Sequence, residues 1–315
     1  MGEQQLGNLA FLFPGQGAQA VGMLADAHAA FPEIGTTFQE ASDALGYDVW
    51  DLVVSGPAEQ LSLTEKTQPI ILTASVALYR AWCANGGARP SVVAGHSLGE
   101  FSALVAAESL AFDDAVKLVR QRGQAMQLAV PVGVGAMAAI LGVPDEDVVA
   151  VCTRISDGAA HHVSAVNFNS PGQVVIAGHA AAVEEAIAAL KEAGAKRAMP
   201  LPVSAPFHTP LMRPAGEVLE QALSEIAVDD PIVPVVSNVN AELQTDGTVI
   251  KRLLVEQIAS PVLWTQCVQT MLDQGCDRFI ECGPGKVLSG LVKRVSKAVS
   301  VASIEAPDAL KGAIE

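Results

Sequence analysis

The segment SVVAGHSLGEFSAL (residues 91–104) joins a short apolar strand, a serine between two glycines and the start of an amphipathic helix. Gly95 and Gly99 complete the pattern G-x-S-x-G, which exposes a serine hydroxyl on a sharp turn from a strand into a helix. The free amides and the dipole at the start of that helix favour the negative charge that develops in acyl transfer. We predict that Ser97 is a nucleophile. The alternative is a glycine-rich turn that carries an unreactive serine.

Strand and helix patterns continue on both sides of this turn. Residues 8–13 form an apolar run that ends at the loop PGQG (residues 14–17). Apolar periodicity predicts further helices and buried strands. The helices are expected at residues 69–84, 113–126 and 286–295, and the strands at 233–237 and 278–281. This alternation predicts an α/β core with a mostly parallel sheet.

The middle of the chain has a different order of elements, strand–helix–strand–strand–helix–strand. The strands are expected at residues 134–141, 162–168, 173–177 and 197–203, with helices at 144–155 and around 183–190. This βαββαβ order is typical of a ferredoxin-like unit. We therefore predict an inserted small domain at 132–204 within a core made of 1–131 and 205–315. The alternative is one continuous α/β sheet.

The composition of the chain limits which partners it can bind and in which cellular compartment it is expected. With 315 residues, 50% hydrophobic and 17% charged, the chain is large and apolar enough for a substantial core. A net charge of −15 repels phosphate backbones, so we expect no nucleic-acid partner. Five cysteines without a C-x-x-C spacing favour neither disulfides nor zinc and indicate a reducing compartment. Without a signal-peptide pattern or a membrane-length apolar run, we expect a cytoplasmic protein with no membrane partner.

Small basic clusters stand out against this acidic average. They suit either an acidic partner or solvated helix ends, and the sequence leaves both open. The clusters contain Lys196, Arg197, Lys286, Lys293, Arg294 and Lys297.

A serine nucleophile needs a base, and histidine is the usual one. His208 lies in SAPFHTP (residues 204–210), a loop restrained by two prolines, and it follows the serine in chain order. We predict that His208 is the base; the alternative is a histidine that only packs its loop. His96 adjoins the serine and is expected to line the pocket. No aspartate stands out as an orienting group, so a neutral carbonyl is one candidate partner of the imidazole. The remaining histidines are expected at surfaces or turns: His28, His161, His162 and His179.

An oxyanion hole needs two donors that point at one position. The amide of Leu98, directly after the serine, is one candidate. The second is expected from another loop at a strand end, and the glycine-rich loop at residues 14–17 allows a close backbone approach. The alternative for this loop is an ordinary tight turn.

One cation lies on an apolar helix face. In the helix expected at residues 113–126, Arg122 falls among Ala115, Leu118, Val119 and Met126, at about 100° per residue. A buried guanidinium needs an anionic or hydrogen-bonding partner. One interpretation is a structural ion pair with a protein carboxylate. The other is a fork that binds the carboxylate of a substrate, which beside a serine nucleophile indicates an acyl group such as malonyl.

Six segments together resemble one family. They read FLFPGQGAQ (11–19), AGHSLGEFSALVAA (94–107), RGQAMQ (122–127), NFNSPGQVVIAG (167–178), LPVSAPFHTPLM (201–212) and ECGPGKVLSGLVKR (281–294). In this order they are similar to malonyl-CoA:acyl carrier protein transacylases of bacterial type II fatty acid synthesis. The resemblance implies an α/β-hydrolase-like core with a mostly parallel sheet and an inserted ferredoxin-like small domain.

The resemblance also implies roles for individual residues. Ser97 matches the nucleophile, His208 the base and Arg122 the arginine that binds the malonyl carboxylate. The amides of Gln16 and Leu98 match the oxyanion hole.

Two further residues enter through the resemblance. Gln257 matches the glutamine whose oxygen supports the histidine, a residue that sequence physics alone did not select. Phe207 resembles the phenylalanine before the histidine in malonyl-selective relatives, and we place it with His96 and Arg122 among the substrate-binding residues.

The expected function follows from these residues. We predict an [acyl-carrier-protein] S-malonyltransferase, an acyltransferase of lipid metabolism that uses malonyl-CoA and acyl carrier protein in fatty acid biosynthesis. It is expected to act as a monomer and to need no cofactor, because the coenzyme A thioester is the substrate. Three alternatives stay open: a polyketide-pathway malonyl or methylmalonyl transferase, a serine thioesterase or other hydrolase, and a non-catalytic carrier-binding protein.

Overall fold

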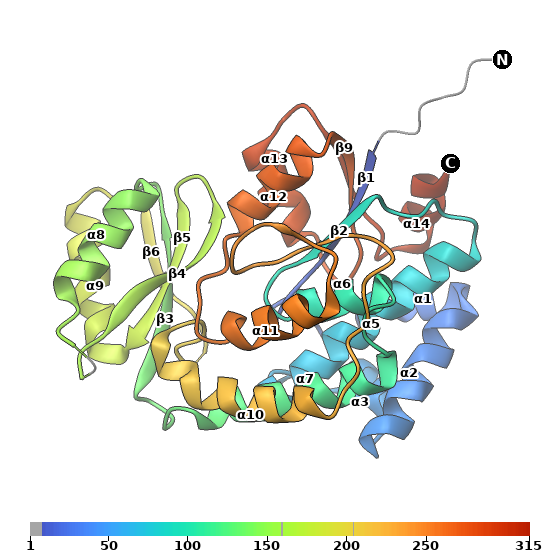
Figure 1. Cartoon of the computed structure of the whole chain (residues 1–315), viewed down its shortest axis with the longest axis horizontal. Coiled ribbons are helices and arrows are strands. Elements are labelled where there is room, and N and C mark those ends of the chain that lie inside the picture. Colours follow the sequence, from blue (N-terminus) through green and yellow to red (C-terminus); the bar gives the residue numbers. More distant parts are fainter. Residues whose placement is uncertain (1–7, 159, 204) are drawn as a thin grey trace.

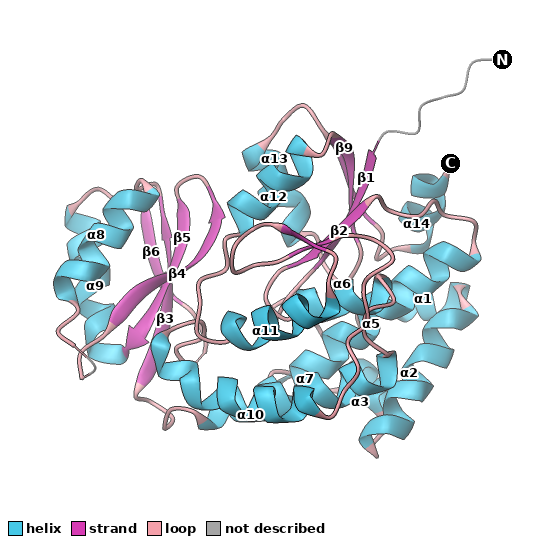
Figure 2. Ribbon diagram, in the orientation of Figure 1, coloured by secondary structure: helices cyan, strands magenta, loops and turns pink. Residues whose placement is uncertain are grey.

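The computed structural model describes residues 8–158, 160–203 and 205–315, and these form two sheets covered by helices (Figures 1 and 2). The larger sheet has the strand order β10-β9-β1-β2-β7-β8 and is parallel except for the β7–β8 pair. This confirms the predicted mostly parallel α/β core. Its strands are β1 (Asn8–Phe13), β2 (Val92–Gly95), β7 (Val235–Val236), β8 (Leu243–Gln244), β9 (Cys276–Glu281) and β10 (Ser300–Ser303).

Both faces of the larger sheet are buried. Along β1, Phe11 and Phe13 face one hydrophobic core, and Ala10 and Leu12 face a second on the opposite side. Such burial on both faces explains why the strand reads as a continuous apolar run. The helices of the second core are α12 (Trp264–Asp273) and α13 (Val287–Val295).

The remaining helices around this sheet supply the first core. They are α1 (Ala25–Ala30), α2 (Pro32–Leu45), α3 (Val49–Ser55), α4 (Ala58–Leu61), α5 (Thr64–Ala84), α6 (Gly99–Ala106), α7 (Phe112–Leu128), α10 (Arg213–Ser224), α11 (Gly247–Gln257) and α14 (Pro307–Ile314). A short 3-10 helix, Pro210–Met212, precedes α10.

The start of α5 differs from the prediction. The apolar pattern of the sequence placed it at Pro69. The helix instead begins at Thr64 and contains Pro69, which is itself buried. Packing of almost the whole helix outweighs the local cost of an internal proline.

The smaller sheet is antiparallel, with the strand order β4-β5-β3-β6. Its elements in chain order are β3 (Gly135–Leu141), α8 (Asp145–Ile155), β4 (Val163–Ser170), β5 (Gln173–His179), α9 (Ala180–Glu192) and β6 (Arg197–Pro200). This confirms the predicted ferredoxin-like βαββαβ order. The domain boundaries stay a prediction, and the one at 204/205 falls on residue 204, outside the described residues. The last strand is shorter than predicted and ends at Pro200; Pro202, which has no N–H to donate, follows it closely.

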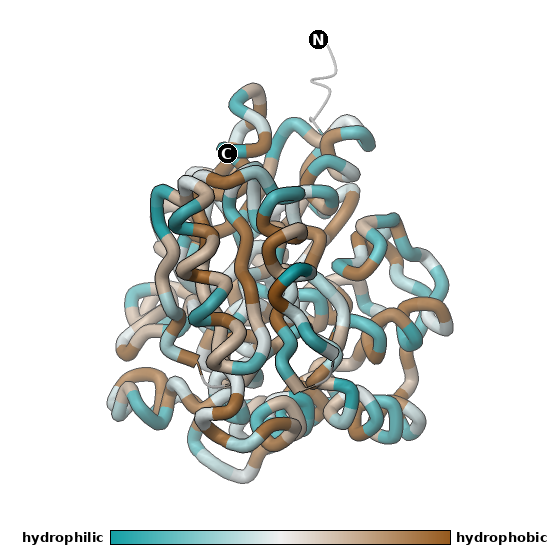
Figure 3. The backbone as a smooth tube through the Cα atoms, turned by 90° about the vertical axis from the view of Figure 1, so that its left-hand side faces the viewer, coloured by the Kyte–Doolittle hydropathy of each residue, from teal (hydrophilic) through white to brown (hydrophobic). Residues whose placement is uncertain are grey.

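The two parts of the molecule meet along β4. Backbone hydrogen bonds join the N–H of Val262 to the carbonyl of Val166, and the N–H of Phe168 to the carbonyl of Val262. In Figure 1 the smaller sheet and helices α8 and α9 lie to the left of the larger part. Figure 3, seen from that side, shows hydrophilic and hydrophobic residues alternating every few residues along the helices, as amphipathic packing requires. Within the described residues, no helix is both long and apolar enough for a membrane span.

The register of the larger sheet positions the loops that matter for the site. Phe13 pairs with Gly95, so β1 and its parallel neighbour β2 end at the same edge. The loop at residues 14–17 and the turn at residues 95–99 therefore lie side by side. At this edge a Cβ on Gly15 would lie 2.5 Å from the carbonyl oxygen of His96, so only glycine fits there.

Candidate active site

Ser97 lies on a strained turn between β2 and α6. Its φ is 52°, in the left-handed region that a residue with a side chain rarely adopts. A Cβ on Gly95 would collide with the backbone of Gly99, and a Cβ on Gly99 would collide with the carbonyl of Phe13. The two glycines of the motif are thus required by contact with backbone, which is the steric reason for the G-x-S-x-G pattern.

An asparagine that the sequence analysis did not select holds this turn. The N–H of Ser97 donates to the Oδ1 of Asn238 at 2.6 Å, and the Nδ2 of Asn238 donates to the carbonyl of Gly95 at 2.7 Å. Asn238 is fully buried and follows the short strand β7. Its position just beyond a buried parallel strand was the available signal, because site residues gather at the carboxyl ends of such strands.

His208 contacts the serine directly. Its Nε2 lies 2.8 Å from the Oγ of Ser97, and its Nδ1 lies 3.0 Å from the backbone carbonyl of Gln257. A carbonyl only accepts, so Nδ1 carries the proton and Nε2 is left to accept from the serine hydroxyl. A neutral carbonyl therefore orients the imidazole. His208 also has a positive φ, 64°.

The surroundings keep the His208 imidazole neutral. Burial, the larger cause, and the nearby charge of Arg122 together lower the pKa of His208 from 6.5 to about 3. A neutral imidazole is the form that can accept the serine proton.

Arg122 reaches the same hydroxyl from α7. Its side chain is 2% exposed, and its Nη2 donates to the Oγ of Ser97 at 3.2 Å. The guanidinium also donates to the Oε1 of Gln68 and to the Oε1 of Gln257, each at 2.9 Å. Its Nε has no hydrogen-bond partner among the described residues. In the part of the chain that the structure describes, Arg122 forms no ion pair with a carboxylate.

The charge of Arg122 persists despite its burial. Burial lowers its pKa from 12.5 to about 10, and the carboxyl of Glu100 partly opposes this shift. A guanidinium that stays protonated beside neutral amides and a hydroxyl can accommodate an anion. Gln68, on α5, is a buried amide that the sequence analysis missed. Its place on the buried side of a long helix was the available signal.

A small cavity of about 120 Å³ opens onto this group. Both parts of the molecule line it, with Met137, Asn167, Leu201 and Val203 coming from the smaller one. The lining contains seven of the eight predicted site residues: Gln16, His96, Ser97, Leu98, Arg122, Phe207 and His208. It also contains Gln68 and Met126. Gln257 is not part of the lining and lies behind it, 0% exposed.

The predicted oxyanion donors and the His96 side chain are placed around the cavity. Among the described residues, the backbone N–H groups of Gln16 and Leu98 donate no hydrogen bond within the chain. His96 points its Nε2 at the Oδ1 of Asn169, 2.8 Å away, and burial lowers its pKa. Asn169, on β4, is another contact that sequence reasoning did not find.

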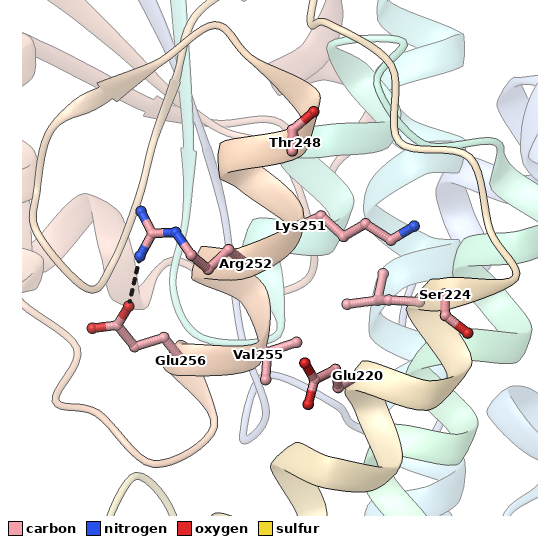
Figure 4. A pocket seen from close by; sticks show the side chains of 8 residues that line it. Glu220, Ser224, Thr248, Lys251, Arg252, Val255 and Glu256 are labelled. Atoms are coloured by element: carbon pink, nitrogen blue, oxygen red, sulfur yellow. Dashed lines mark hydrogen bonds and ion pairs between the residues drawn. The ribbon is translucent and has the colours of Figure 1, made fainter.

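A second hollow lies between α10 and α11, away from the serine (Figure 4). Its side chains include the exposed pair Arg252 and Glu256, 3.3 Å apart, and Lys251. Among the described residues that line it, no nucleophile is paired with a base. In the described ranges, no three His, Cys, Asp or Glu side chains are grouped so as to hold a metal ion.

Comparison with known proteins places the chain in a family. Residues 10–307 match the acyl transferase domain family. The malonyl CoA-acyl carrier protein transacylase of Escherichia coli (strain K12) is 54% identical over 306 residues, which cover 97% of this chain and 98% of that protein.

Solved structures agree with this match. The malonyl CoA-acyl carrier protein transacylase of Coxiella burnetii is 45% identical, has a TM-score of 0.96 and covers 98% of this chain and 97% of its own. A malonyl-transacylase in complex with its type II PKS acyl-carrier protein is 49% identical, with a TM-score of 0.95 and coverage of 98% and 99%. Together with the serine, histidine and arginine gathered at one cavity, these matches show that the chain belongs to the acyl transferase domain family, among the malonyl CoA-acyl carrier protein transacylases.

Proposed function

We propose that this chain transfers a malonyl group from malonyl-CoA to the phosphopantetheine thiol of acyl carrier protein, through an ester on Ser97, and so supplies fatty acid biosynthesis. The observation that carries the proposal is the position of Arg122. Its buried guanidinium lies 3.2 Å from the Oγ of Ser97, and its hydrogen-bond acceptors among the described residues are all neutral. A substrate with a terminal carboxylate would supply a directly bonded counter-charge within reach of the nucleophile.

The first half of the proposed cycle forms the ester. The Nε2 of His208 takes the proton of Ser97 as its Oγ attacks the thioester carbonyl, and the charge passes to the carbonyl oxygen. The N–H groups of Gln16 and Leu98 are the proposed donors to that oxygen. The intermediate then collapses, the C–S bond breaks, and the coenzyme A sulfur leaves with the proton from His208.

The second half returns the enzyme to its starting state. The carrier's thiol enters, gives its proton to His208 and attacks the ester carbonyl. The C–O bond to Ser97 breaks, and the serine recovers its proton. The carbonyl of Gln257 holds the imidazole in one tautomer through both halves. In this scheme Arg122 binds the malonyl carboxylate, while His96 and Phe207 form walls of the pocket.

The scheme draws on groups of the chain and the two thiols alone, so we propose a cofactor-independent enzyme. We also keep as predictions the monomeric state, the cytoplasmic location and the absence of a nucleic-acid or membrane partner. The exposed basic residues Lys286, Lys293 and Arg294 are candidate contacts for an acidic carrier.

Intact-protein mass spectrometry after incubation with malonyl-CoA tests the proposal. We expect one malonyl group on the wild type and none on Ser97→Ala. Adding holo acyl carrier protein should move the group to the carrier. An ester that decays to free enzyme at the same rate without the carrier would indicate a hydrolase instead.

A second candidate is a transferase of a polyketide pathway, because a similar structure contains a type II PKS acyl-carrier protein with its malonyl-transacylase. A panel of carriers from both pathways, with malonyl-CoA and methylmalonyl-CoA as donors, distinguishes the two. Faster transfer to a polyketide carrier would favour the second candidate.

A further inference from the structure

Two carboxylates are buried in the described part of the chain, and they have different surroundings. Glu281 is 0% exposed and accepts from the N–H groups of Leu288 and Ser289, at the start of α13. Glu100 is 2% exposed and lies in the first turn of α6, three positions after Ser97. Glu281 caps a helix, whereas the contacts of Glu100 all come from outside its own helix.

One oxygen of Glu100 accepts two hydrogen bonds. The Nε2 of Gln257 donates to its Oε2 at 2.8 Å, and the backbone N–H of Asn238 donates to the same atom at 3.1 Å. Both donors are completely buried. Without this oxygen, the N–H of Asn238 would lose its acceptor in the interior, and the Nε2 of Gln257 would keep only the carbonyl of Ser97. Both losses cost free energy.

The first donor leads to the arginine. An amide has one oxygen and one nitrogen end, so donation from Nε2 to Glu100 fixes which end of Gln257 faces Arg122. The Oε1 of Gln257 then accepts from the Nη2 of Arg122 at 2.9 Å. A flipped amide would present N–H groups to the guanidinium. Glu100, at the shorter distance, and the backbone carbonyl of Ser97 both accept from this Nε2, and together they set the orientation of the group that holds Arg122 beside Ser97.

The second donor leads to the nucleophile. Asn238 accepts from the N–H of Ser97 and donates to the carbonyl of Gly95. In addition, the Nε2 of Gln257 lies 3.1 Å from the carbonyl oxygen of Ser97. The same carboxylate therefore restrains both the turn that carries the hydroxyl and the amide beside the cation.

We propose that Glu100 is a positioning residue for selection of the acyl group. Through Gln257 and Asn238 it fixes Arg122 and Ser97 relative to each other. The thioester carbonyl of an acyl chain whose carboxylate binds Arg122 is then held beside the nucleophile. This rests on the proposed malonyl transfer. Glu100 also provides the carboxyl whose charge acts on Arg122 across Gln257, and burial raises the pKa of Glu100 to about 7.

Three substitutions distinguish the role of Glu100 as a hydrogen-bond acceptor from the role of its negative charge. Glu100→Leu removes the acceptor. Glu100→Asp keeps the charge and shortens the side chain by one methylene. Glu100→Gln removes the charge and keeps one acceptor oxygen. Glu256→Gln is the matched control, because Glu256 precedes Gln257 on α11 but is exposed and pairs with Arg252 (Figure 4).

The measurements are kcat/KM for malonyl-CoA and for acetyl-CoA, together with labelling of Ser97 by a fluorophosphonate, which needs no carboxylate contact. For a misplaced positioning group we expect malonyl kcat/KM to fall about 100-fold in Glu100→Leu and about tenfold in Glu100→Asp. The malonyl-to-acetyl ratio should fall in both variants, and fluorophosphonate labelling should fall less than malonyl transfer. Glu100→Gln should lose less than either, and Glu256→Gln should match the wild type.

Several outcomes would overturn the proposal. One is an unchanged malonyl-to-acetyl ratio in variants that circular dichroism shows to be folded. Another is a loss in Glu100→Gln as large as in Glu100→Leu, which would mean that charge rather than the acceptor matters. If Glu100→Leu does not fold, Glu100→Asp decides the case by the same ratio. A wild type that takes up no malonyl group would instead refute the proposed function, and the two failures are therefore distinguishable.

Discussion

The Oγ of Ser97 lies 2.8 Å from the Nε2 of His208, and both residues have left-handed backbone, with φ of 52° and 64°. Such a conformation costs a residue with a side chain about 1–3 kcal/mol, so it persists only where the surroundings enforce it. Here Asn238 holds the serine turn and the carbonyl of Gln257 holds the imidazole. The proposed nucleophile and base are therefore held in place by the chain itself.

Removing the cation should change the acyl preference of the enzyme. In Arg122→Ala the malonyl carboxylate would lose its charged partner, so we expect kcat/KM for malonyl-CoA to fall about 100-fold or more. Transfer from acetyl-CoA should fall far less or rise, because no carboxylate has to be paired. Arg120→Ala is the control, since Arg120 is on the same helix but donates to the carbonyl of Leu45. Malonyl transfer at the wild-type rate in Arg122→Ala would remove the basis for the substrate assignment.

The pH dependence of acylation should lack the usual histidine limb. Burial and the charge of Arg122 lower the pKa of His208 from 6.5 to about 3. The imidazole of the free enzyme is then already neutral at pH values well below 6.5, and kcat/KM should stay flat as pH falls through that value. Stopped-flow measurement of the malonyl-Ser97 ester at different pH values tests this. A fall in kcat/KM with an apparent pKa near 6.5, without a matching loss of folding stability at that pH, would contradict this prediction.

Glu100 should give the stability of the fold its own pH dependence. Burial raises the pKa of Glu100 from 4.5 to about 7, so the folded chain keeps a proton that the unfolded chain releases near pH 4.5. Its contribution to stability is therefore full below pH 4.5 and is lost as pH rises through 7. The side chain in Glu100→Gln cannot lose a proton, so its stability lacks this pH dependence. The free energy of unfolding of Glu100→Gln relative to that of the wild type should therefore rise by on the order of 1–3 kcal/mol from about pH 5 to about pH 8.

Urea unfolding of the wild type and of Glu100→Gln at several pH values measures this difference. Buried His208 contributes in the opposite direction, because its lowered pKa reduces stability as pH falls below 6.5. This contribution is present in both proteins and cancels in the comparison. A difference that does not change with pH would show that Glu100 stays ionised in the fold.

A methyl group at the serine turn should be far more damaging than one on a nearby helix. In Gly99→Ala the new Cβ would collide with the carbonyl of Phe13 in β1, and backbone cannot move aside cheaply. We expect a loss of about 3 kcal/mol of stability and of most labelling by a fluorophosphonate. Gly290→Ala is the matched control, because in α13 no described residue comes within 4 Å of its Cβ position, apart from its chain neighbours and the backbone of its own helix. That variant should be as stable as the wild type or gain up to about 1 kcal/mol.

The turn at residues 95–99 and the burial of Arg122 were predicted from the sequence because each depends on residues that are close along the chain. A strand, two glycines and a helix suffice to indicate a strained serine. A period of about 100° per residue suffices to place Arg122 on the apolar face of α7, where it is 2% exposed. The βαββαβ order of the smaller sheet was predicted for the same reason, since it follows from the succession of local patterns.

The partners of these residues were decided only by tertiary structure. Glu100 meets Asn238 across 138 positions and Gln257 across 157 positions, and no local periodicity links such distant segments. Gln257 entered through family resemblance, and Asn238, Gln68 and Glu100 were missed. Hydrogen bonds between buried polar groups depend on where loops and helix ends meet after the sheets have packed. The sequence therefore determined which groups are predicted to react, because their local patterns carry that signal, and the packing of distant segments determined how they are held.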